Sequence, residues 1–413
     1  NLSNSVIKVF VDLYNKKLIY KAKKLVNWDV VLKTAISDLE VDQREVNSQL
    51  YYINYPIEGS DKFITIATTR PETMLGDTAI AVNPKDDRFK NIVGKSVTIP
   101  LANRKIKIIT DDYADPEQGT GAVKITPAHD FNDYDVGIRN KLEVINIFTP
   151  DGKINDNAPD PYKGLDRFAA RKLILEHLEE GKFLEKIEKL VNKVPYGDRS
   201  NSIIEPYLTE QWFVDAKTLA IKAKEVVNNG KTKFFPENWS KTYFQWMDNI
   251  EPWCISRQLW WGHQIPAWYG PDGKIFVAEN EDECKKQAKE FYSKEVELKR
   301  DEDVLDTWFS SGLWPFATLG WPEKTPEVEK FYPTSVLVTG FDIIFFWVAR
   351  MIMMGTEFLK EEPFKNIYVH ALVRDEKGQK MSKSKGNVID PLELIEKYSA
   401  DALRFTLLSM ASP

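Results

Sequence analysis

The sequence predicts a mixed α/β protein that contains a separate β-rich domain. Residues 45–195 hold short runs of β-forming residues separated by Gly, Pro, Asn and Asp, a pattern typical of a compact domain built from strands. Residues 335–373 follow a different order, with a strand, a tight turn, a long apolar helix and a second strand. That order is typical of an open α/β sheet, where small polar ligands bind at the turns between strands and helices.

Composition limits the class of protein. The 413 residues are enough for two or three domains, and 43% hydrophobic with 29% charged residues is typical of a globular chain. The net charge of −6 means that a nucleic-acid partner would need a local track of positive charge. The longest apolar run, residues 341–354, contains Asp342 and Arg350 and is too short and too polar for a bilayer span, so we expect no membrane contact.

The two cysteines, Cys254 and Cys284, lie far apart and lack CxxC spacing. This excludes a disulfide framework and a four-cysteine zinc site. Two isolated cysteines fit a reducing compartment, and we expect a cytoplasmic protein.

The β-rich domain can be divided into elements. Its expected strands are Tyr51–Tyr55, Phe63–Thr69, Thr78–Val82, Ser96–Ile99, Lys105–Thr110 and Ala122–Thr126. A helix is expected from Leu165 to Glu180, with Gly181 as its stop. Ahead of the domain, Val6–Leu13 has the composition of an extended segment.

Two motifs of this domain carry polar chemistry. In residues 68–77, a strand ends at the hydroxyl of Thr68 and the guanidinium of Arg70. In residues 119–134, a pair of glycines permits close backbone approach, and a strand then presents Lys124 and Thr126 on one face.

The turn after this second strand gathers His129, Asp130 and Asp133. An imidazole with two carboxylates could hold a divalent metal, which would suit a metal-dependent phosphohydrolase. Alternatively, Asp130 caps a helix that begins near Phe131, with Asp133 in its first turn. Spacing alone leaves both interpretations open.

From residue 194 onward the tryptophan content rises, and most of these side chains are expected to pack in the core. The segment from Trp253 to Pro266 is denser in polar and aromatic residues than packing requires. Arg257, Trp260 and His263 in this segment suit stacking and hydrogen bonding to an unpaired RNA end.

The C-terminal part contains the α/β unit and a lysine-rich loop. We expect a strand at Ser335–Val338, a helix from Phe341 to about Phe358 that Thr339 caps, and a strand at Asn366–Val373 that carries His370. The loop Lys380-Met381-Ser382-Lys383-Ser384 follows, with Gly378 and Gly386 on either side. Its two lysines and two hydroxyls can neutralise a polyphosphate. Helices are expected at Pro391–Tyr398 and Ala400–Met410.

Residues 375–391, with the string DEKGQKMSKSKGNVIDP, resemble the ATP-handling loop of class I aminoacyl-tRNA synthetases. The motifs at residues 68–77 and 119–134 resemble the editing domain inserted in the valine-, isoleucine- and leucine-specific members. Residues 260–263, 306–309 and 339–351 most closely resemble the valine-specific members, and the resemblance covers about residues 25–413. One departure is Gln118, where the family usually has an aromatic residue that would stack on a base.

The resemblance implies a partial Rossmann-type catalytic domain with an inserted editing domain. The expected parts are residues 1–44 (end of the first catalytic half and linker ribbon), 45–195 (editing domain), 196–330 (return connector and Trp-rich core) and 331–413 (second catalytic half). No His-Ile-Gly-His-type tetrapeptide occurs, and no helical anticodon-binding domain follows the lysine loop. We therefore expect a central portion of a longer enzyme.

The resemblance also implies roles for individual residues. Lys380 and Lys383 would be catalytic. The ATP site would comprise Lys380, Ser382, Lys383, His370 and Gly340. The valine site would comprise Trp308, Asp342, Ile343 and Trp347. The editing site would comprise Thr68, Arg70, Lys124, Thr126, Asp130 and Asp133.

The implied function is ATP-dependent activation of valine and its transfer to tRNA(Val), with hydrolysis of mischarged threonyl-tRNA(Val). ATP with Mg²⁺, valine and tRNA(Val) are the expected partners, zinc is not expected, and we expect a monomer. The alternatives are a fragment of an isoleucine-specific enzyme and a tRNA-binding relative without catalytic activity.

Overall fold

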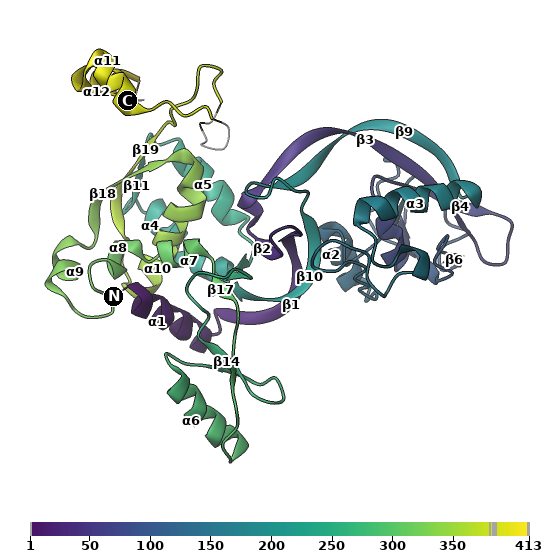
Figure 1. Ribbon diagram of the computed structural model, residues 1–413, viewed down its shortest axis with the longest axis horizontal. Helices are drawn as coiled ribbons and strands as arrows, with labels where there is room; N and C mark the ends of the chain where they lie inside the picture. Colours follow the sequence, from purple (N-terminus) through teal and green to yellow (C-terminus); the bar gives the residue numbers. More distant parts are fainter. Residues whose placement is uncertain (1, 380, 382–385, 411–413) are drawn as a thin grey trace. The chain divides into compact units, whose positions relative to one another are not determined.

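A computed structural model describes residues 2–379, 381 and 386–410. The chain folds into two compact units. One unit comprises residues up to Tyr20 together with residues from Trp212 onward, and the other is Lys21–Gln211. The chain crosses between the units within strand β1 (Ile19–Asp29) and strand β10 (Glu205–Val214) (Figure 1).

The unit Lys21–Gln211 contains two β-sheets of its own. The four-stranded sheet has the order β6-β7-β5-β8, in which β5 and β7 are parallel and the other pairs are antiparallel. The three-stranded sheet has the order β4-β3-β9 and is antiparallel. The strands are β3 (Val41–Pro56), β4 (Phe63–Thr68), β5 (Ala79–Val82), β6 (Ser96–Thr98), β7 (Lys105–Thr110), β8 (Ala122–Ile125) and β9 (Leu184–Gly197).

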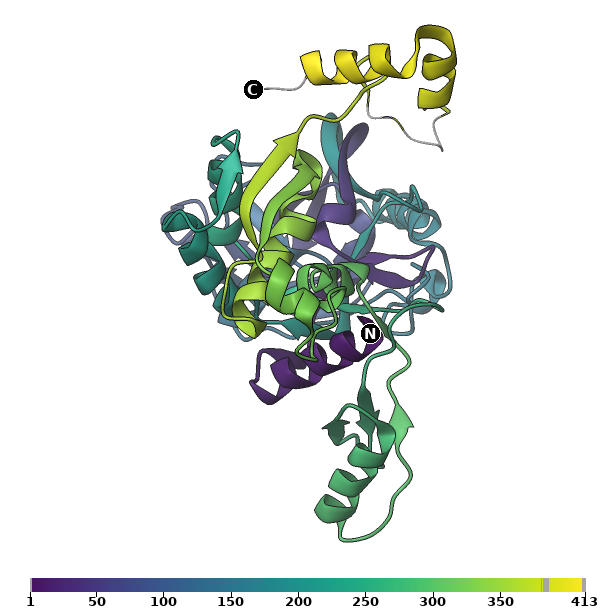
Figure 2. The same ribbon diagram turned by 90° about the vertical axis from the view of Figure 1, so that its left-hand side faces the viewer.

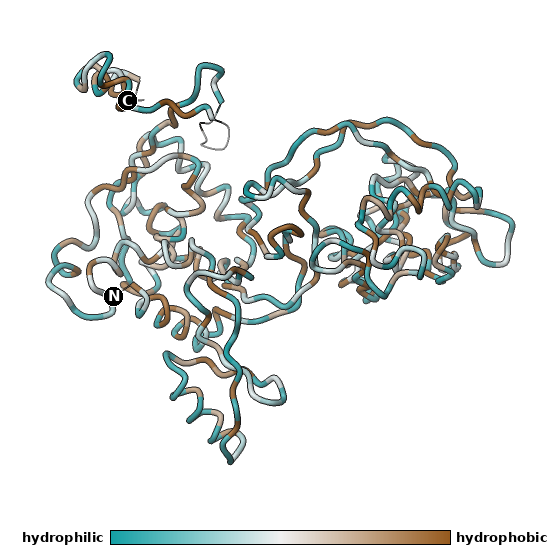
Figure 3. The backbone as a smooth tube through the Cα atoms, viewed as in Figure 1, coloured by the Kyte–Doolittle hydropathy of each residue, from teal (hydrophilic) through white to brown (hydrophobic). Residues whose placement is uncertain are grey.

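Strands β3 and β9 pair from Val41 opposite Gly197 to Ile53 opposite Leu184, and they form the long curved ribbon in Figure 1. Hydrophobic residues are interspersed among hydrophilic ones along this ribbon (Figure 3). Where β3 meets β4, alternate side chains point into the core, and Ile53, Ile64 and Ile66 are almost fully buried there. A period of two is expected of a strand with one buried face.

Short helices complete this unit. They are η1 (Asp38–Glu40), η2 (Pro71–Gly76), α2 (Phe131–Arg139), η3 (Asp160–Tyr162) and α3 (Arg167–Glu180). The short strand β2 (Thr34–Ile36) precedes η1. Helix α3 buries Ala170, Ile174 and Leu178, four residues apart, against the strands. Gly181 follows its last turn as expected.

The other unit has a parallel sheet, β11-β19-β18. Helices α1, α4 and α10 supply much of its core, in which Val9, Phe10, Ala223 and Met354 are among the fully buried side chains. Its main elements are α1 (Leu2–Asn15), α4 (Ala216–Asn228), β11 (Lys233–Phe235), α5 (Trp239–Asp248), β18 (Thr334–Gly340), α10 (Arg350–Phe358), β19 (Phe364–His370), α11 (Pro391–Tyr398) and α12 (Ala400–Met410). Figure 2 shows these strands with the adjoining helices.

Smaller elements lie between α5 and β18. They are β12 (Trp253–Cys254), β13 (Ser256–Arg257), β14 (Ala267–Tyr269), β15 (Ile275–Val277), α6 (Glu281–Tyr292), β16 (Lys299–Arg300), β17 (Val304–Leu305), α7 (Thr307–Ser311), α8 (Trp314–Ala317) and α9 (Pro326–Phe331). Helix α6 packs on β14 and β15 through a small cluster that includes Trp268, Phe276 and Cys284. Within the described part of the chain, no helix is both long and apolar enough to cross a membrane.

Most of the expected strands and helices are confirmed to within two or three residues at their ends, although Tyr51–Tyr55 is only part of the longer β3. The extended segment expected at Val6–Leu13 is wrong, because these residues lie in helix α1. Val6, Val9, Phe10 and Leu13 are buried, and their spacing of three and four residues matches one face of a helix. Tertiary burial of that face outweighs the weak helix propensity of valine.

The prediction of one continuous α-helix from Phe341 to Phe358 is also wrong in detail, because the segment has three different helical parts. It consists of a 3₁₀ turn (η4, Phe341–Ile343), a π-helical segment (η5, Ile344–Ala349) and then α10. Thr339 does not cap it, because its hydroxyl donates to the carbonyl of Gly340. The unit Lys21–Gln211 extends beyond the expected domain at both ends, since residues 21–44 and 196–211 belong to it.

Replacing Ile53 by Ala should lower the free energy of unfolding of the unit Lys21–Gln211 by about 2–5 kcal/mol, because a cavity would open among side chains that do not collapse. Ile187→Ala is the matched control, since this side chain is 47% exposed, and its effect should stay within about 0.5 kcal/mol. Urea unfolding of both variants measures the difference. Equal midpoints for the two variants would contradict the burial pattern.

Candidate functional site

The buried carboxylate of Asp77 lies at the centre of the polar cluster in the unit Lys21–Gln211. It accepts hydrogen bonds from the Tyr55 hydroxyl at 2.8 Å and from the Thr126 hydroxyl at 2.6 Å. The ammonium of Lys124 lies 3.4 Å from the same carboxylate and also contacts the Thr126 hydroxyl. Burial raises the pKa of Asp77, while the charge of Lys124 and the hydroxyl donors lower it.

These contacts fix the positions of Lys124 and Thr126 at the end of β8. Both side chains point the same way from the strand, as their spacing of two predicts. The Lys124 side chain is only 9% exposed, so its charge depends on Asp77 for compensation. Asp77 is the last residue of the polar motif at residues 68–77, but it was not among the site residues predicted from the sequence.

Helix α2 supplies the second carboxylate of the cluster. Asp130 caps the helix, which was one of the two interpretations that the spacing left open, and its carboxylate accepts from the main-chain N–H groups of Asn132 at 2.8 Å and Asp133 at 3.1 Å. The buried carboxylate of Asp133 accepts from the main-chain N–H of Thr126 at 2.9 Å. Within α2, Gly137 has no Cβ to clash with Pro127, which lets the turn after β8 lie close to the helix.

The environment of Asp133 shifts its titration into the neutral range. Burial raises its pKa to about 7, and the negative charge of Asp130 adds to this effect. The positive charge of Lys124 works in the opposite direction. A buried carboxyl group with a pKa near 7 is typical of functional sites.

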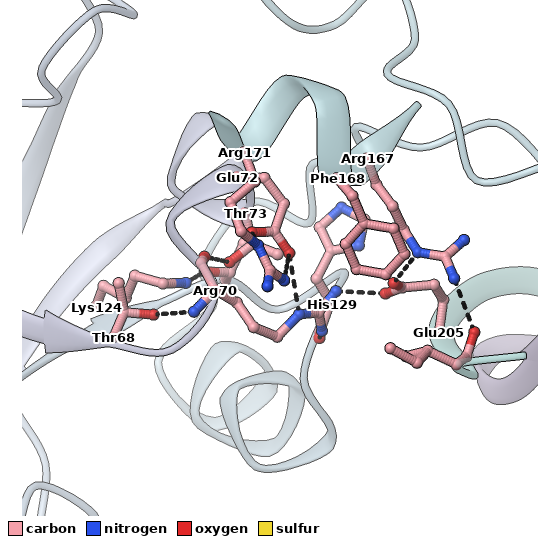
Figure 4. Close-up of polar contacts among 12 residues, drawn as sticks. Thr68, Arg70, Glu72, Thr73, Lys124, His129, Arg167, Phe168, Arg171 and Glu205 are labelled. Atoms are coloured by element: carbon pink, nitrogen blue, oxygen red, sulfur yellow. Dashed lines mark hydrogen bonds and ion pairs between the residues drawn. The ribbon is translucent and has the colours of Figure 1, made fainter. Parts of the chain in front are cut away.

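Thr68 and Arg70 complete the set of residues expected at this site. The Thr68 hydroxyl accepts a hydrogen bond from the main-chain N–H of Arg70 at 3.0 Å, at the end of β4. The Arg70 guanidinium donates to the carbonyl of His129 at 3.0 Å and pairs with Glu72 and Glu205 (Figure 4). The structure therefore brings the six expected residues into one region of the unit.

His129 contacts the main chain and an aromatic ring instead of the carboxylates of the site. Its Nε2 accepts the main-chain N–H of Ile147 at 3.0 Å, and its ring packs edge-on against Phe148. Burial, together with the positive charges of Arg70 and Lys124, lowers its pKa well below the ordinary value. Among the described residues, no group of three or more His, Cys, Asp or Glu side chains gathers around a common point where a metal could bind.

A cavity of about 720 Å³ is lined in part by Tyr113, whose pKa is raised by burial and by the nearby charges of Asp133 and Asp130. It is also lined by Ala67 of β4, Val123 of β8 and the glycine loop that contains Gly119, whereas Thr68 and Lys124, the next residues along these strands, are not in its lining. Gln118 and the partly exposed ring of Tyr113 also line it, so an aromatic surface is present although residue 118 is not aromatic. The volume is in the range of sites that bind drug-sized or nucleoside-sized ligands.

The other unit contains the residues expected to bind ATP and valine. Strand pairing places Gly340 opposite His370 at the ends of β18 and β19, and a Cβ at Gly340 would lie 2.8 Å from the carboxylate of Asp342. Gly340, Asp342 and His370 therefore lie together at the carboxyl ends of two parallel strands, where open α/β sheets bind ligands.

The apolar residues of the expected valine site come from two helical segments. Trp308 lies in α7, and Ile343 and Trp347 lie in η4 and η5. The ring of Trp308 lies 5.2 Å from that of Phe346, between centroids, and the Trp347 indole donates to the carbonyl of Ser311 at 3.1 Å. Ile343 is half-buried at the end of η4. Lys380, Ser382 and Lys383 lie outside the described residues.

The residues expected to contact RNA are not equally accessible. Trp260 is fully exposed and Trp261 is 92% exposed, next to the half-buried His263. Arg257 is buried, and its guanidinium pairs with Asp306 at 3.1 Å and donates to the carbonyls of Cys254 and Ser256. Arg257 thus holds the polypeptide in this structure instead of presenting its charge at the surface.

A profile for the tRNA synthetases class I (I, L, M and V) matches residues 1–413. The chain belongs to the class I tRNA synthetases. It is 79% identical over 413 residues to a valine–tRNA ligase of Pelagibacter ubique (strain HTCC1062), matching all of this chain and 47% of that protein. It is 59% identical over 452 residues to the valine–tRNA ligase of Bradyrhizobium diazoefficiens (strain USDA 110), again covering 47% of the relative.

This class I chain thus spans about half the length of the curated relatives it matches. Among solved structures, it is similar to the Agrobacterium radiobacter K84 agnB2 LeuRS in a ternary complex with tRNA and LeuAMS. The identity is 20%, the TM-score is 0.43, and the match covers 98% of this chain and 56% of that one, a similarity too low to support an argument.

The titration of Asp133 leads to a prediction about stability. Because its pKa in the folded protein, about 7, lies above the ordinary value of about 3.9, folding favours the protonated form. The contribution of Asp133 to stability is therefore complete below pH 4 and is lost as the pH rises through 7. Asp133→Asn should gain stability relative to the unsubstituted protein between pH 5 and pH 8, as measured by urea unfolding at several pH values. A stability difference that does not change with pH would contradict the raised pKa.

Proposed function

We propose that this chain is part of a valine–tRNA ligase, and that the unit Lys21–Gln211 is its editing domain, which hydrolyses threonine from mischarged tRNA(Val). The observation that carries the editing proposal is the buried polar cluster of Lys124, Thr126, Asp77 and Asp133. The relatives described as valine–tRNA ligases support the choice of valine.

The editing reaction is the attack of water on an ester. The water oxygen bonds to the carbonyl carbon, the bond from that carbon to the terminal ribose oxygen breaks, and the ribose oxygen takes up a proton. The products are free threonine and tRNA with an intact 3′ end. The protein needs to place the water and to stabilise the negative charge that develops on the carbonyl oxygen.

The residues of the cluster suit these tasks. The ionised carboxylate of Asp133 can bind the ammonium of the amino acid, and with Asp130 it can accept the threonine hydroxyl and orient water. Lys124 provides a buried positive charge near the ester, held in place by Asp77. Thr68, Arg70 and Thr126 would surround the terminal adenosine and the ester.

An editing site is needed because an apolar pocket distinguishes isosteric amino acids poorly. Valine-specific synthetases are themselves the established example, with a discrimination of about a hundredfold against threonine. A polar site that must bond the hydroxyl of threonine discriminates in the opposite sense, because valine would leave its buried groups without partners. The two kinds of site together account for the two kinds of residue in this chain.

The synthetic reaction would take place in the other unit, in the full-length enzyme. Trp308, Ile343 and Trp347 would line the valine pocket, and Asp342 would bind the valine ammonium. Gly340 and His370, with Lys380, Ser382 and Lys383 of the lysine loop, would bind ATP with Mg²⁺. The rate would come from positioning the valine carboxylate in line with the α-phosphate and from neutralising charge.

The decisive experiment is deacylation of threonyl-tRNA(Val) by this chain. Asp133→Ala should reduce the rate at least about a hundredfold, because the ammonium and hydroxyl of threonine lose their partner. Asp135→Ala is the matched control, since Asp135 is an exposed residue of the same helix, and it should retain the full rate. Preferential hydrolysis of valyl-tRNA(Ile) would instead support an isoleucine-specific enzyme, and a folded chain that hydrolyses neither would contradict the proposal.

The rate should also depend on pH. Since only ionised Asp133 binds the ammonium, kcat/KM for deacylation should rise through an apparent pKa near 7 and level off above pH 8. Spontaneous ester hydrolysis, measured without protein, is subtracted at each pH. A profile that stays flat between pH 6 and pH 8 would mean that Asp133 does not set the rate.

A further inference from the structure

A chain of buried ion pairs leads to Arg70 from two sides. On one side, Arg171 makes two hydrogen bonds to Glu72, at 2.7 Å and 2.8 Å, and Glu72 lies 3.4 Å from Arg70. On the other side, Arg167 lies 3.0 Å from Glu205, which pairs directly with Arg70. We call these five residues the arginine–glutamate network (Figure 4).

The members of the arginine–glutamate network come from elements far apart in the sequence. Glu72 belongs to η2, Arg167 and Arg171 belong to α3, and Glu205 is the first residue of β10. The two carboxylates are almost completely enclosed, with 1% and 4% of their side chains exposed. Burial alone would raise the pKa of Glu72, but the hydrogen bonds and charge of Arg171, together with the charge of Arg70, hold it below its ordinary value.

Stability alone does not explain this arrangement. Apolar side chains of similar volume often stabilise a fold as well as, or better than, buried ion pairs, because they carry no cost of removing charge from water. What the ion pairs do provide is direction. A guanidinium held by carboxylates on two sides keeps its remaining N–H groups in a fixed orientation.

The remaining donor of Arg70 points to the turn that carries the carboxylates of the site. Its Nη1 donates to the carbonyl of His129 at 3.0 Å, and the N–H of His129 donates to the carbonyl of Thr126 at 2.9 Å. This turn begins at Thr126, whose N–H bonds the carboxylate of Asp133, and ends at Asp130, which caps α2. Both attachments of Asp133 therefore depend on the turn that Arg70 holds.

We propose that Glu72 and Glu205 are positioning residues for the hydrolytic site. They orient Arg70, Arg70 fixes the turn between Thr126 and Asp130, and the turn fixes Asp133. Loss of either carboxylate frees the guanidinium to move toward Asp130, whose negative charge already acts on it. Asp130 would then be drawn away from the cap of α2. This proposal rests on the proposed editing function.

The test is a double-mutant cycle on deacylation of threonyl-tRNA(Val). Glu205→Gln, which keeps the shape and removes the charge, should lower kcat by about tenfold to a hundredfold, because a small misplacement in a preorganised site has an effect of this size. In the background of Arg70→Gln, the same substitution should change kcat less than about twofold, because the glutamate acts only through the arginine. An unchanged kcat in Glu205→Gln, or effects of the two substitutions that simply multiply, would overturn the proposal.

A matched control separates this role from general loss of a buried carboxylate. Glu357 of the other unit is also enclosed and pairs with three cations, Lys16 at 2.7 Å, Lys222 at 3.0 Å and Lys360 at 3.6 Å. Glu357→Gln should leave deacylation unchanged. If Glu205→Gln does not fold, Glu72→Gln is carried through the same cycle with Arg70→Gln and is judged by the same two outcomes.

A readout without catalysis distinguishes failure of this proposal from failure of the proposed function. Hydrogen exchange of the main-chain amides of Asn132 and Asp133 should accelerate at least about tenfold in Glu205→Gln, because the cap of α2 loosens. Unchanged exchange at these amides would overturn the positioning role, whatever the activity. An unsubstituted protein that does not hydrolyse threonyl-tRNA(Val) would refute the editing function, and the exchange measurement would still decide on the positioning role.

Discussion

The requirement that a buried carboxylate be compensated determines the geometry of the polar site. Asp77 is completely enclosed, and such a group is tolerated only when donors and a positive charge surround it. Tyr55 from β3, Thr126 from the end of β8 and the Lys124 ammonium meet this requirement. Because these partners cannot leave without exposing an uncompensated charge to an apolar interior, the ammonium of Lys124 is fixed before any ligand arrives. A preorganised charge of this kind stabilises a developing anion without further rearrangement.

The two buried carboxylates of the cluster have different environments and therefore different roles. Asp77 faces two hydroxyl donors and an ammonium, whereas Asp133 receives a main-chain hydrogen bond and lies near the charge of Asp130. Asp133 consequently titrates near neutral pH, which suits a group that must bind a cation and handle a proton. Asp77 holds the lysine, and in the proposed function Asp133 acts on the ligand. Assigning different tasks to neighbouring carboxyl groups through their surroundings is a general strategy of hydrolytic sites.

Local patterns in the sequence predicted much of this fold. The strands around Phe63–Thr68 and Lys105–Thr110, the cap at Asp130 and the end of α3 at Gly181 all follow from residue types a few positions apart. Helix α1 was missed, because its valines favour an extended strand when each is considered alone, and only the period of the buried face identifies the helix.

The residues that orient the site could not be predicted in the same way. Glu205 lies 135 residues from Arg70 in sequence, and Arg171 lies 99 residues from Glu72. Nothing in the neighbourhood of Glu205 distinguishes it from a charge on the surface, and Glu72 was not singled out although it lies within the polar motif of residues 68–77. Their role follows from tertiary contact alone. Asp77 was closer to recognition, because it ends a motif whose hydroxyls and arginine were already identified as polar chemistry.

In the proposed function, the apolar residues around Trp308 and the polar residues around Asp133 impose opposite tests on the same amino acids, which would explain why both belong in one enzyme. A pocket formed by Trp308, Ile343 and Trp347 can exclude side chains that are too large, but it gains little from excluding a hydroxyl that replaces a methyl group. A site built around Asp133 requires that hydroxyl, because without it a buried acceptor would lose its partner. Threonine passes the apolar test by its size and also meets the requirement of the polar site, where it is hydrolysed, whereas valine lacks the hydroxyl that the polar site requires. The proposed function therefore requires that Lys124 and Asp133 be held in fixed positions, and the buried charges around them meet that requirement.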